Sequence, residues 1–204
     1  MGNPAAIGAW SGALVCASIV PYAIRTYERK IQPVAMSWVL WAFLGLAVLV
    51  TYRSAGAESN VWPAVFGFAN PAVIAILCAC GRAEWKKPSR AERFCFAVGV
   101  VSLAMWAFVR HRVALAQYAL YIAMAADLCA AIPTILFVWR QPDRDRPFAW
   151  VLYAAGYFLA VFAIPRDTLA NWILPVYMIA LALIVAFPLV RYRLRLRVPL
   201  TQWL

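Results

Sequence analysis

One carboxylate stands in the middle of a long apolar segment: Asp127, in the stretch AMAADLCAAIP. A charged group at the centre of a bilayer costs about 2.5–3.5 kcal/mol on insertion scales, so it must face the interior of a helical bundle or water, or be protonated. The functional interpretation is a group on a transport path that binds a substrate or couples protons. The structural alternative is a carboxyl that is hydrogen-bonded to a neighbouring helix for packing. We favour the functional interpretation.

A second polar group, Asn70, lies in the apolar stretch FGFANPA, directly before a proline. An amide offers two donors and an acceptor, enough to hold a polar substrate, although asparagine in membranes also forms hydrogen bonds between helices. We favour the substrate pocket and add two lesser candidates. Ser18 is polar and within a span, but back-bonding to its own helix is the more common fate of such a serine. Tyr157 is a candidate for the wall of the pocket if it faces inward.

The remaining residue types exclude other kinds of chemistry. There is no His, Asp and Glu cluster with metal-ligand spacing, no nucleophile elbow and no Gly-rich phosphate loop, so we expect no enzyme, no metal and no cofactor. The only histidine, in RHR at 110–112, is expected in an exposed loop. An odd number of cysteines within apolar segments favours packed free thiols; they are Cys16, Cys78, Cys80, Cys95 and Cys129.

Apolar helices must position these side chains. Hydrophobic residues make up 66% of the 204 residues and charged ones 13%, against about 45–50% and about 25% in soluble domains. We predict an all-α integral membrane protein with seven transmembrane helices, in the lipid bilayer of the bacterial inner membrane. Seven apolar segments suffice to cross ~30 Å of hydrocarbon; they lie at approximately 5–24, 34–52, 61–80, 94–109, 114–138, 148–164 and 170–190.

The basic residues indicate the orientation in the membrane. Fifteen of the nineteen lysines and arginines lie in the links after the first, third and fifth segments and in the C-terminal tail. By the positive-inside rule the N-terminus faces out and the C-terminus faces the cytoplasm. The net charge of +11 is thus a topology signal, and we expect no nucleic-acid partner. We interpret the tail sequence RYRLRLR as arginines that snorkel to lipid headgroups.

The sequence also repeats at an offset of 112 residues. The alignment needs no gap from the first segment to the start of the third, and it pairs Pro21 with Pro133, SWVLWA (37–42) with AWVLYA (149–154), and Pro63 with Pro175. Three helices are an odd number, so a direct fusion would invert the second copy, and one extra helix restores a parallel arrangement. We therefore predict a 3+1+3 architecture with a cavity between two parallel triple-helix repeats.

The domain boundaries follow from that repeat. The first triple-helix repeat is expected at 1–81, the linker helix at 82–112, and the second triple-helix repeat with a basic tail at 113–204. Trp38 and Trp150 lie near the cytoplasmic end of the second helix of each copy. An interfacial aromatic belt is the ordinary explanation of such residues, and the alternative is an inner gate or a ring-stacking platform.

On these features the chain resembles the SWEET/PQ-loop (MtN3-like) transporter superfamily, as a divergent bacterial-type member. The Pro-Gln of that family appears here as Pro21-Tyr22 and Pro133-Thr134, and the basic residues and the serine of MSW that follow look like the downstream part of the motif. The resemblance implies that Pro21 and Pro133 hinge the gates. It also implies that Asn70 is similar to the third-helix asparagine that faces a central pocket.

The chain departs from the family at several positions. The counterpart of Asn70 in the second repeat is Ala182, and the prolines within the second and sixth helices are missing. Sugar specificity is therefore not carried over. Val15 is likewise replaced by Asp127 in the second repeat, which suggests an asymmetric substrate such as a small polar or cationic metabolite.

The leading interpretation is a transporter of a small polar metabolite that works by alternating access through a midplane site between the repeats. Protons are candidate coupling ions. Two alternatives stay open: a non-transporting receptor or scaffold of the same architecture, and an ion channel. The sequence also leaves open the substrate, facilitated as against proton-coupled transport, and whether the chain forms a homo-oligomer.

Overall fold

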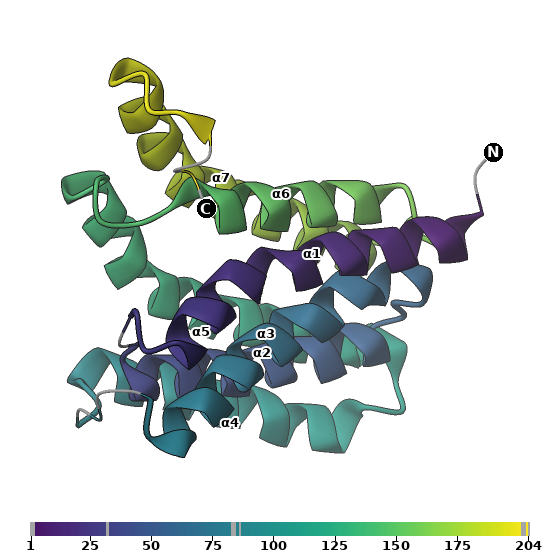
Figure 1. The fold of residues 1–204 in the computed structure, drawn as a ribbon. Helices are drawn as coiled ribbons and strands as arrows, with labels where there is room; N and C mark the ends of the chain where they lie inside the picture. The colour runs from purple at the N-terminus through teal and green to yellow at the C-terminus, as the bar shows by residue number, and fades with distance from the viewer. Residues whose placement is uncertain (1–2, 32, 83–84, 86, 201–202, 204) are drawn as a thin grey trace.

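The computed structural model describes residues 3–31, 33–82, 85, 87–200 and 203. This part of the chain is all-α, with seven α-helices and no β-strand (Figure 1). The helices are α1 (Pro4–Tyr27), α2 (Ala35–Ser54), α3 (Trp62–Leu77), α4 (Arg90–Val109), α5 (Val113–Arg140), α6 (Pro147–Val161) and α7 (Leu169–Arg195). A short 3-10 helix, η1 (Ser59–Val61), precedes α3, and a π-helical turn, η2 (Cys78–Arg82), follows it.

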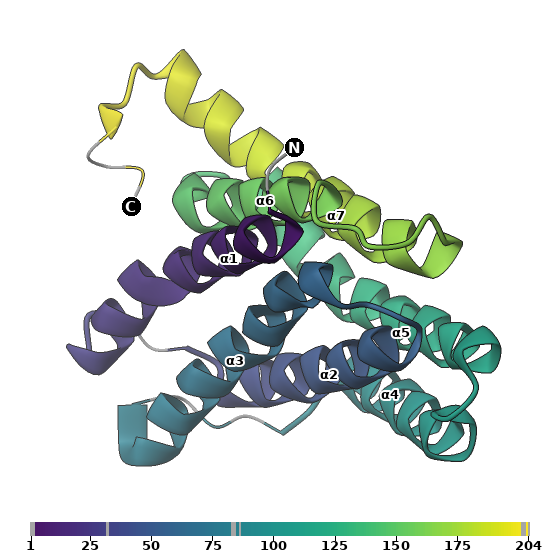
Figure 2. The same ribbon diagram turned by 90° about the vertical axis from the view of Figure 1, so that its right-hand side faces the viewer.

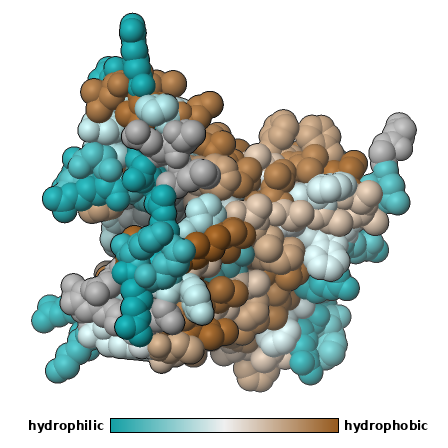
Figure 3. Space-filling view, viewed as in Figure 1, coloured by the Kyte–Doolittle hydropathy of each residue, from teal (hydrophilic) through white to brown (hydrophobic). Residues whose placement is uncertain are grey.

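Six helical segments are long and apolar enough to cross a membrane, with α3 taken together with η1 and the start of η2 as Ser59–Gly81, whereas α6 has only 15 residues. The prediction of a span over 148–164 is therefore wrong at its C-terminal end. Pro165 has no N–H to donate to the carbonyl of Val161 four residues earlier, and residues 162–164 close the end of α6 with bonds to the third residue before each. Hydrophobic residues cover the middle of the visible face, with hydrophilic residues mainly toward its left and right edges (Figure 3). Length and composition support an integral membrane protein.

The connections alternate between two ends of the bundle. The α1–α2, α3–α4 and α5–α6 connections and the C-terminal end of α7 lie at the left in Figure 1, and the N-terminus and the other three connections lie at the right. We call the first the basic end; its described residues are 28–31, 33–34, 78–82, 85, 87–89 and 141–146, with 196–200 and 203 of the tail. We call the second the opposite end, formed by residues 55–61, 110–112 and 162–168 with the start of α1.

The helices pack in two groups, which Figure 2 shows above and below one another. The upper group contains α1, α6 and α7, and the lower group contains α2, α3, α4 and α5. Within the groups, α6 packs against α1 and α7, and α2 packs against α3 and α5. Between the groups, α1 packs against α3 and α7 packs against α5. The linker helix α4 lies against α5 and α2.

Polar contacts fasten α4 to its neighbours. Ser37 Oγ at the start of α2 donates to Glu92 Oε1 of α4 at 3.0 Å. Ser102 Oγ, which is fully buried, donates to the backbone carbonyl of Ala119 on α5 at 2.8 Å. Hydrogen bonds between helices are a common way to orient packed helices in membranes. The linker helix is thus fixed on both sides.

Pro21 and Pro133 both lie inside continuous helices, α1 and α5. Each proline removes one backbone donor from the helix ladder, and the helix continues through it. Both residues therefore mark weakened turns in the first helix of each predicted repeat. The side chain of Pro133 is exposed and that of Pro21 is partly buried.

Candidate functional site

The candidate site is built around Asp127 of α5. Its Oδ2 accepts a hydrogen bond of 2.7 Å from Tyr177 Oη on α7. On α6 the hydroxyls of Tyr153 and Tyr157 lie close together at Gly67, and Tyr153 Oη donates to Met178 Sδ, next to Tyr177 on α7, at 3.8 Å. We call Asp127, Tyr153, Tyr157 and Tyr177 the tyrosine cluster. No lysine, arginine or histidine forms an ion pair with Asp127 in the part of the chain that the structure describes, so its partners there are phenolic.

Tyr157 faces the interior of the bundle, with 1% of its side chain exposed. Its ring lies 5.0 Å from that of Tyr153, centroid to centroid. Both hydroxyls point to Gly67 of α3, because a β-carbon placed on Gly67 would lie 3.1 Å from Tyr157 Oη and 3.2 Å from Tyr153 Oη. Among the described residues, Tyr157 Oη has no hydrogen-bond partner. A buried hydroxyl without a partner costs about 1–3 kcal/mol, and native structures contain few of them.

Asn70 and Ser18 lie at the contact between α3 and α1. Asn70 Nδ2 donates to the backbone carbonyl of Val15 at 2.7 Å and to Ser18 Oγ at 3.4 Å. Ser18 Oγ also donates to the Val15 carbonyl, at 2.6 Å, which is the expected back-bond. These contacts favour the interhelical interpretation of Asn70. The structure does not bring Asn70 into hydrogen-bond contact with the tyrosine cluster, although Val15 packs in the same buried core as Tyr157.

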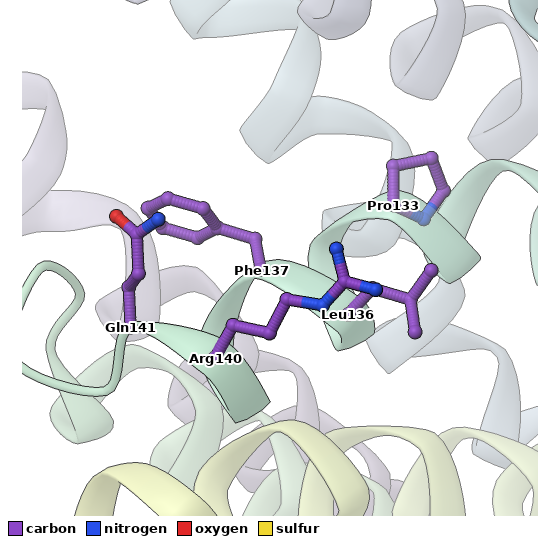
Figure 4. Close-up of a pocket in the computed structure, with 5 residues that line it drawn as sticks. All are labelled: Pro133, Leu136, Phe137, Arg140 and Gln141. Atoms are coloured by element: carbon purple, nitrogen blue, oxygen red, sulfur yellow. The ribbon is translucent and has the colours of Figure 1, made fainter.

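Two of the pockets in the structure lie at the surface, away from Asp127 and Asn70. The first, of about 320 Å³, lies along the C-terminal turns of α5 at the basic end (Figure 4); it is lined by Pro133, Leu136, Phe137, Arg140 and Gln141. The second, of about 540 Å³, lies between α2, α3 and α4; it is lined by Leu49, Val50, Arg53, Ser54, Val61, Trp62, Val65 and Trp106. The cavity expected between the repeats is neither of these, since Asp127 and Asn70 line neither pocket.

A row of aromatic side chains crosses the basic end. Tyr22 of α1 stacks near Trp38 of α2, with ring centroids 4.9 Å apart. Trp38 lies 6.3 Å from Trp41, which meets the ring of Trp150 on α6 edge-on at 6.2 Å. The row therefore joins α1 and α2 to α6. The gate role of Trp38 and Trp150 stays a prediction.

The opposite end is closed by polar groups that the sequence interpretation missed. Tyr52, Asn60 and Asn171 are each 1% exposed. Asn60 Nδ2 donates to Tyr52 Oη and, at 3.4 Å, to Asn171 Oδ1, while Tyr52 Oη donates to the Asn171 carbonyl at 3.1 Å. We call these three residues the amide network. In a sequence, an asparagine near the start of a helix is most simply interpreted as a helix cap. That Asn60 and Asn171 connect distant segments is evident only from their shared burial in the structure.

Two further contacts support the same closure. Ser59 Oγ donates to the backbone carbonyl of Ala163 at 2.7 Å. Arg166 forms an exposed ion pair of 3.1 Å with Glu58. An exposed pair of this kind contributes about 0–1 kcal/mol, so the buried amide network dominates the closure of the opposite end.

Arg193 corrects the interpretation of the basic tail. Its side chain is 3% exposed, and its guanidinium donates to the backbone carbonyls of Pro142 at 3.2 Å, Leu189 at 3.3 Å and Asp145. Snorkelling to lipid headgroups is thus wrong for this arginine. The five donors of a guanidinium suit several carbonyls at once, and Arg193 holds the α5–α6 connection against α7.

Replacing Arg193 by methionine is expected to lower the free energy of unfolding by about 1–3 kcal/mol, because the carbonyls of Pro142 and Asp145 lose their donor in a partly buried setting. Thermal unfolding in one detergent measures the effect. Arg195→Met is the matched control, since Arg195 is exposed on the same helix, and it should change stability by no more than about 0.5 kcal/mol. Equal effects of the two variants would contradict the structural role of Arg193.

The site and fold together define an all-helical chain of membrane-spanning composition with a carboxylate and three tyrosines among its packed helices. In the described residues no three His, Cys, Asp or Glu side chains lie together as a metal site. The five cysteines are free thiols, of which Cys80 is exposed. Comparison of the chain with known protein families, curated proteins and solved structures finds no match.

Proposed function

We propose that this chain carries a small polar metabolite across the bacterial inner membrane by alternating access, as a divergent relative of the SWEET/PQ-loop transporters. Its two parallel triple-helix repeats are 1–81 and 113–204, joined by α4. The N-terminus faces out and the basic end faces the cytoplasm, as the positive-inside rule predicts. The solute binds at the tyrosine cluster, which belongs to the second repeat and faces the first repeat where the hydroxyls of Tyr153 and Tyr157 meet Gly67.

The observation that carries this proposal is the way the packing maps onto itself. A shift of 112 residues turns α1, α2 and α3 into α5, α6 and α7. The α1–α3 contact then becomes α5–α7, the α2–α3 contact becomes α6–α7, and the α1–α6 contact becomes α5–α2, and all six contacts are present. If a twofold axis relates the two repeats, each helix contact must have a counterpart between the equivalent helices. The six contacts meet this requirement and so support two related repeats.

The direction of the helices supports parallel repeats. Both α1 and α5 run from the opposite end to the basic end (Figure 1). Repeats of this kind are related by an axis along the membrane normal, and carriers built from repeats place their substrate near the midplane between them. The linker helix α4 provides the odd crossing that keeps the copies parallel.

The two closures support alternating access. The amide network joins α2 and η1 to α7 at the opposite end, and the aromatic row joins α1 and α2 to α6 at the basic end. Each closure therefore contains residues of both proposed repeats. The tyrosine cluster lies on α5, α6 and α7, which run from one end of the bundle to the other. Rocking of one repeat against the other would break one closure at a time.

Replacing Asp127 by asparagine is expected to reduce solute uptake into proteoliposomes about tenfold or more, which corresponds to about 1.4 kcal/mol, because the amide keeps the shape and loses the charge. The solute is first found by thermal-shift screening against sugars, vitamins, nucleosides and amines, since a ligand stabilises the state that it binds. Asp143→Asn, in an exposed connection, is the control. Unchanged uptake with unchanged pH dependence would remove Asp127 from the mechanism.

One observation favours a second candidate, a non-transporting receptor or scaffold of the same architecture. The two pockets lie at the periphery, and the residues between the proposed repeats pack in one buried core. Saturable ligand binding without flux into proteoliposomes would support this candidate over the carrier.

A further inference from the structure

Resting on the proposed function, we infer that the tyrosine cluster binds a small organic ammonium ion that carries no carboxylate, with Asp127 as its counter-ion. The inference concerns the class of substrate at the site between the repeats. It depends on three features of the cluster: an uncompensated carboxylate, aromatic rings beside it, and a buried hydroxyl without a partner.

The first feature is the charge of Asp127. One carboxylate oxygen accepts from Tyr177 at 2.7 Å, and no basic side chain of the described residues pairs with the group. Asp127 as a whole residue is partly exposed. Carboxylates inside membrane-spanning bundles are costly and pair with another charge or mark a substrate path. An ammonium ligand supplies the missing positive charge.

The second feature is the aromatic surrounding. Tyr153 and Tyr157 lie with their ring centroids 5.0 Å apart, and Tyr177 approaches Asp127 from α7. The faces of tyrosine rings attract cations, and cages of such rings recognise ammonium groups. A carboxylate bonded by Tyr177, with the paired rings of Tyr153 and Tyr157 on the helix that packs against α7, is better matched to an ammonium ion than to a neutral sugar.

The third feature is Tyr157 Oη, which is buried and has no hydrogen-bond partner in the described part of the chain. Gly67 leaves room for this hydroxyl and for that of Tyr153, and a β-carbon there would press on both. A buried polar atom without a hydrogen-bond partner in the protein indicates a bond to a water molecule or to a ligand group. The ligand thus carries a hydrogen-bonding group in addition to its charge.

The lack of a basic side chain in the tyrosine cluster limits the class of substrate further. An amino acid has a carboxylate that needs a cation, and the tyrosine cluster contains neither lysine nor arginine. An amino-alcohol or a hydroxylated quaternary ammonium ion satisfies Asp127 and Tyr157 together without adding a negative charge. Amino acids and betaines are expected to be rejected, because their carboxylate would lie near that of Asp127.

Thermal unfolding of the full-length protein in detergent tests the inference with matched probes. Choline carries the charge and a hydroxyl, 3,3-dimethyl-1-butanol is its neutral isostere, and glycine betaine keeps the quaternary ammonium group but has a carboxylate in place of the CH2OH group. Ethanolamine and ethylene glycol form the same pair for a primary ammonium. We expect choline or ethanolamine to raise Tm in a saturable way, with the neutral and zwitterionic probes without effect.

Two variants locate the site. Asp127→Asn is expected to abolish the Tm shift, and Tyr157→Phe to weaken binding severalfold while keeping the ring. The Tm of each variant without ligand shows that it folds. A shift of equal size with 3,3-dimethyl-1-butanol, an undiminished shift in Asp127→Asn, or no shift with either ammonium probe overturns the inference.

The result also separates this inference from the carrier proposal. Counterflow of radiolabelled choline or ethanolamine into proteoliposomes measures transport independently of binding. Ammonium binding without counterflow retains the substrate class and rejects the carrier. Transport of a neutral solute by a protein that binds neither ammonium probe retains the carrier and rejects the substrate class.

Discussion

Replacing Gly8 by alanine is expected to be the most damaging single change in the first helix, with a loss of about 1–3 kcal/mol or more of unfolding free energy. A β-carbon at Gly8 would lie 1.9 Å from the backbone carbonyl oxygen of Ser59. Gly156→Ala, on α6, is expected to act similarly, because its β-carbon would meet Val15 Cγ2 at 2.5 Å and the Ser11 carbonyl oxygen at 2.8 Å. Backbone atoms cannot rotate away, so the helices themselves must separate.

Gly99→Ala is the matched control for these variants. Its β-carbon would also come close to neighbours, at 2.7 Å from Leu44 Cδ2 and from Phe43 Cε1. These atoms are the ends of side chains that can adopt other rotamers, so the loss should be smaller. Thermal unfolding of the three variants in one detergent gives the order. A Gly99 variant as unstable as the Gly156 variant would show that close backbone approach is not what limits substitution.

The same glycines matter for the proposed carrier. Gly156 lies where α1 packs on α6, the contact between the two proposed repeats, and small residues let membrane helices approach closely there. A variant that separates these helices without unfolding the protein therefore reports on the interface that has to move. Reduced uptake by folded Gly156→Ala would accord with rocking of the repeats.

Hydropathy predicted the helices well because the membrane imposes length and composition on each of them. Six spans are confirmed as helices of sufficient length, and the all-α class is confirmed. The predicted span ran three residues beyond the end of α6 because Phe162, Ala163 and Ile164 are as apolar as the helix before them. Successive helices run in opposite directions, so successive connections lie at alternate ends of the bundle. The connections after the first, third and fifth helices therefore share one end, and these carry most of the basic residues.

The polar contacts were less predictable, since they depend on which distant segments meet. Asn60 and Asn171 are 111 residues apart, and Tyr177 lies 50 residues from Asp127. In both pairs, the residue types alone do not indicate which two residues form the hydrogen bond. Arg193 illustrates the same limit, because alternating arginines in a tail look alike until one of them is buried under a connection. Asp127 itself was identifiable from the cost of its charge.

Replacing Asn60 by alanine is expected to lower the free energy of unfolding by about 2 kcal/mol. The substitution leaves Asn171 Oδ1 without its donor and the Glu58 N–H without its acceptor, while Tyr52 Oη keeps its bond to the Asn171 carbonyl. A buried group left unpaired costs about 1–3 kcal/mol. A double-mutant cycle with Asn171→Ala should give a coupling of about 0.5 kcal/mol or more, since the two side chains share one network. Gln141→Ala, at an exposed position of the basic end, is the control.

Hydrogen exchange then tests whether this network closes the opposite end as a unit. In Asn60→Ala, residues 55–61 and 162–168 should exchange faster together, because the contact that joins the two connections is gone, while 141–146 at the basic end should be unchanged. Local opening of this kind has its own free energy, separate from global unfolding. Faster exchange confined to 55–61 would mean that the two connections open independently, and the amide network would then not act as one of the two closures of an alternating-access cycle.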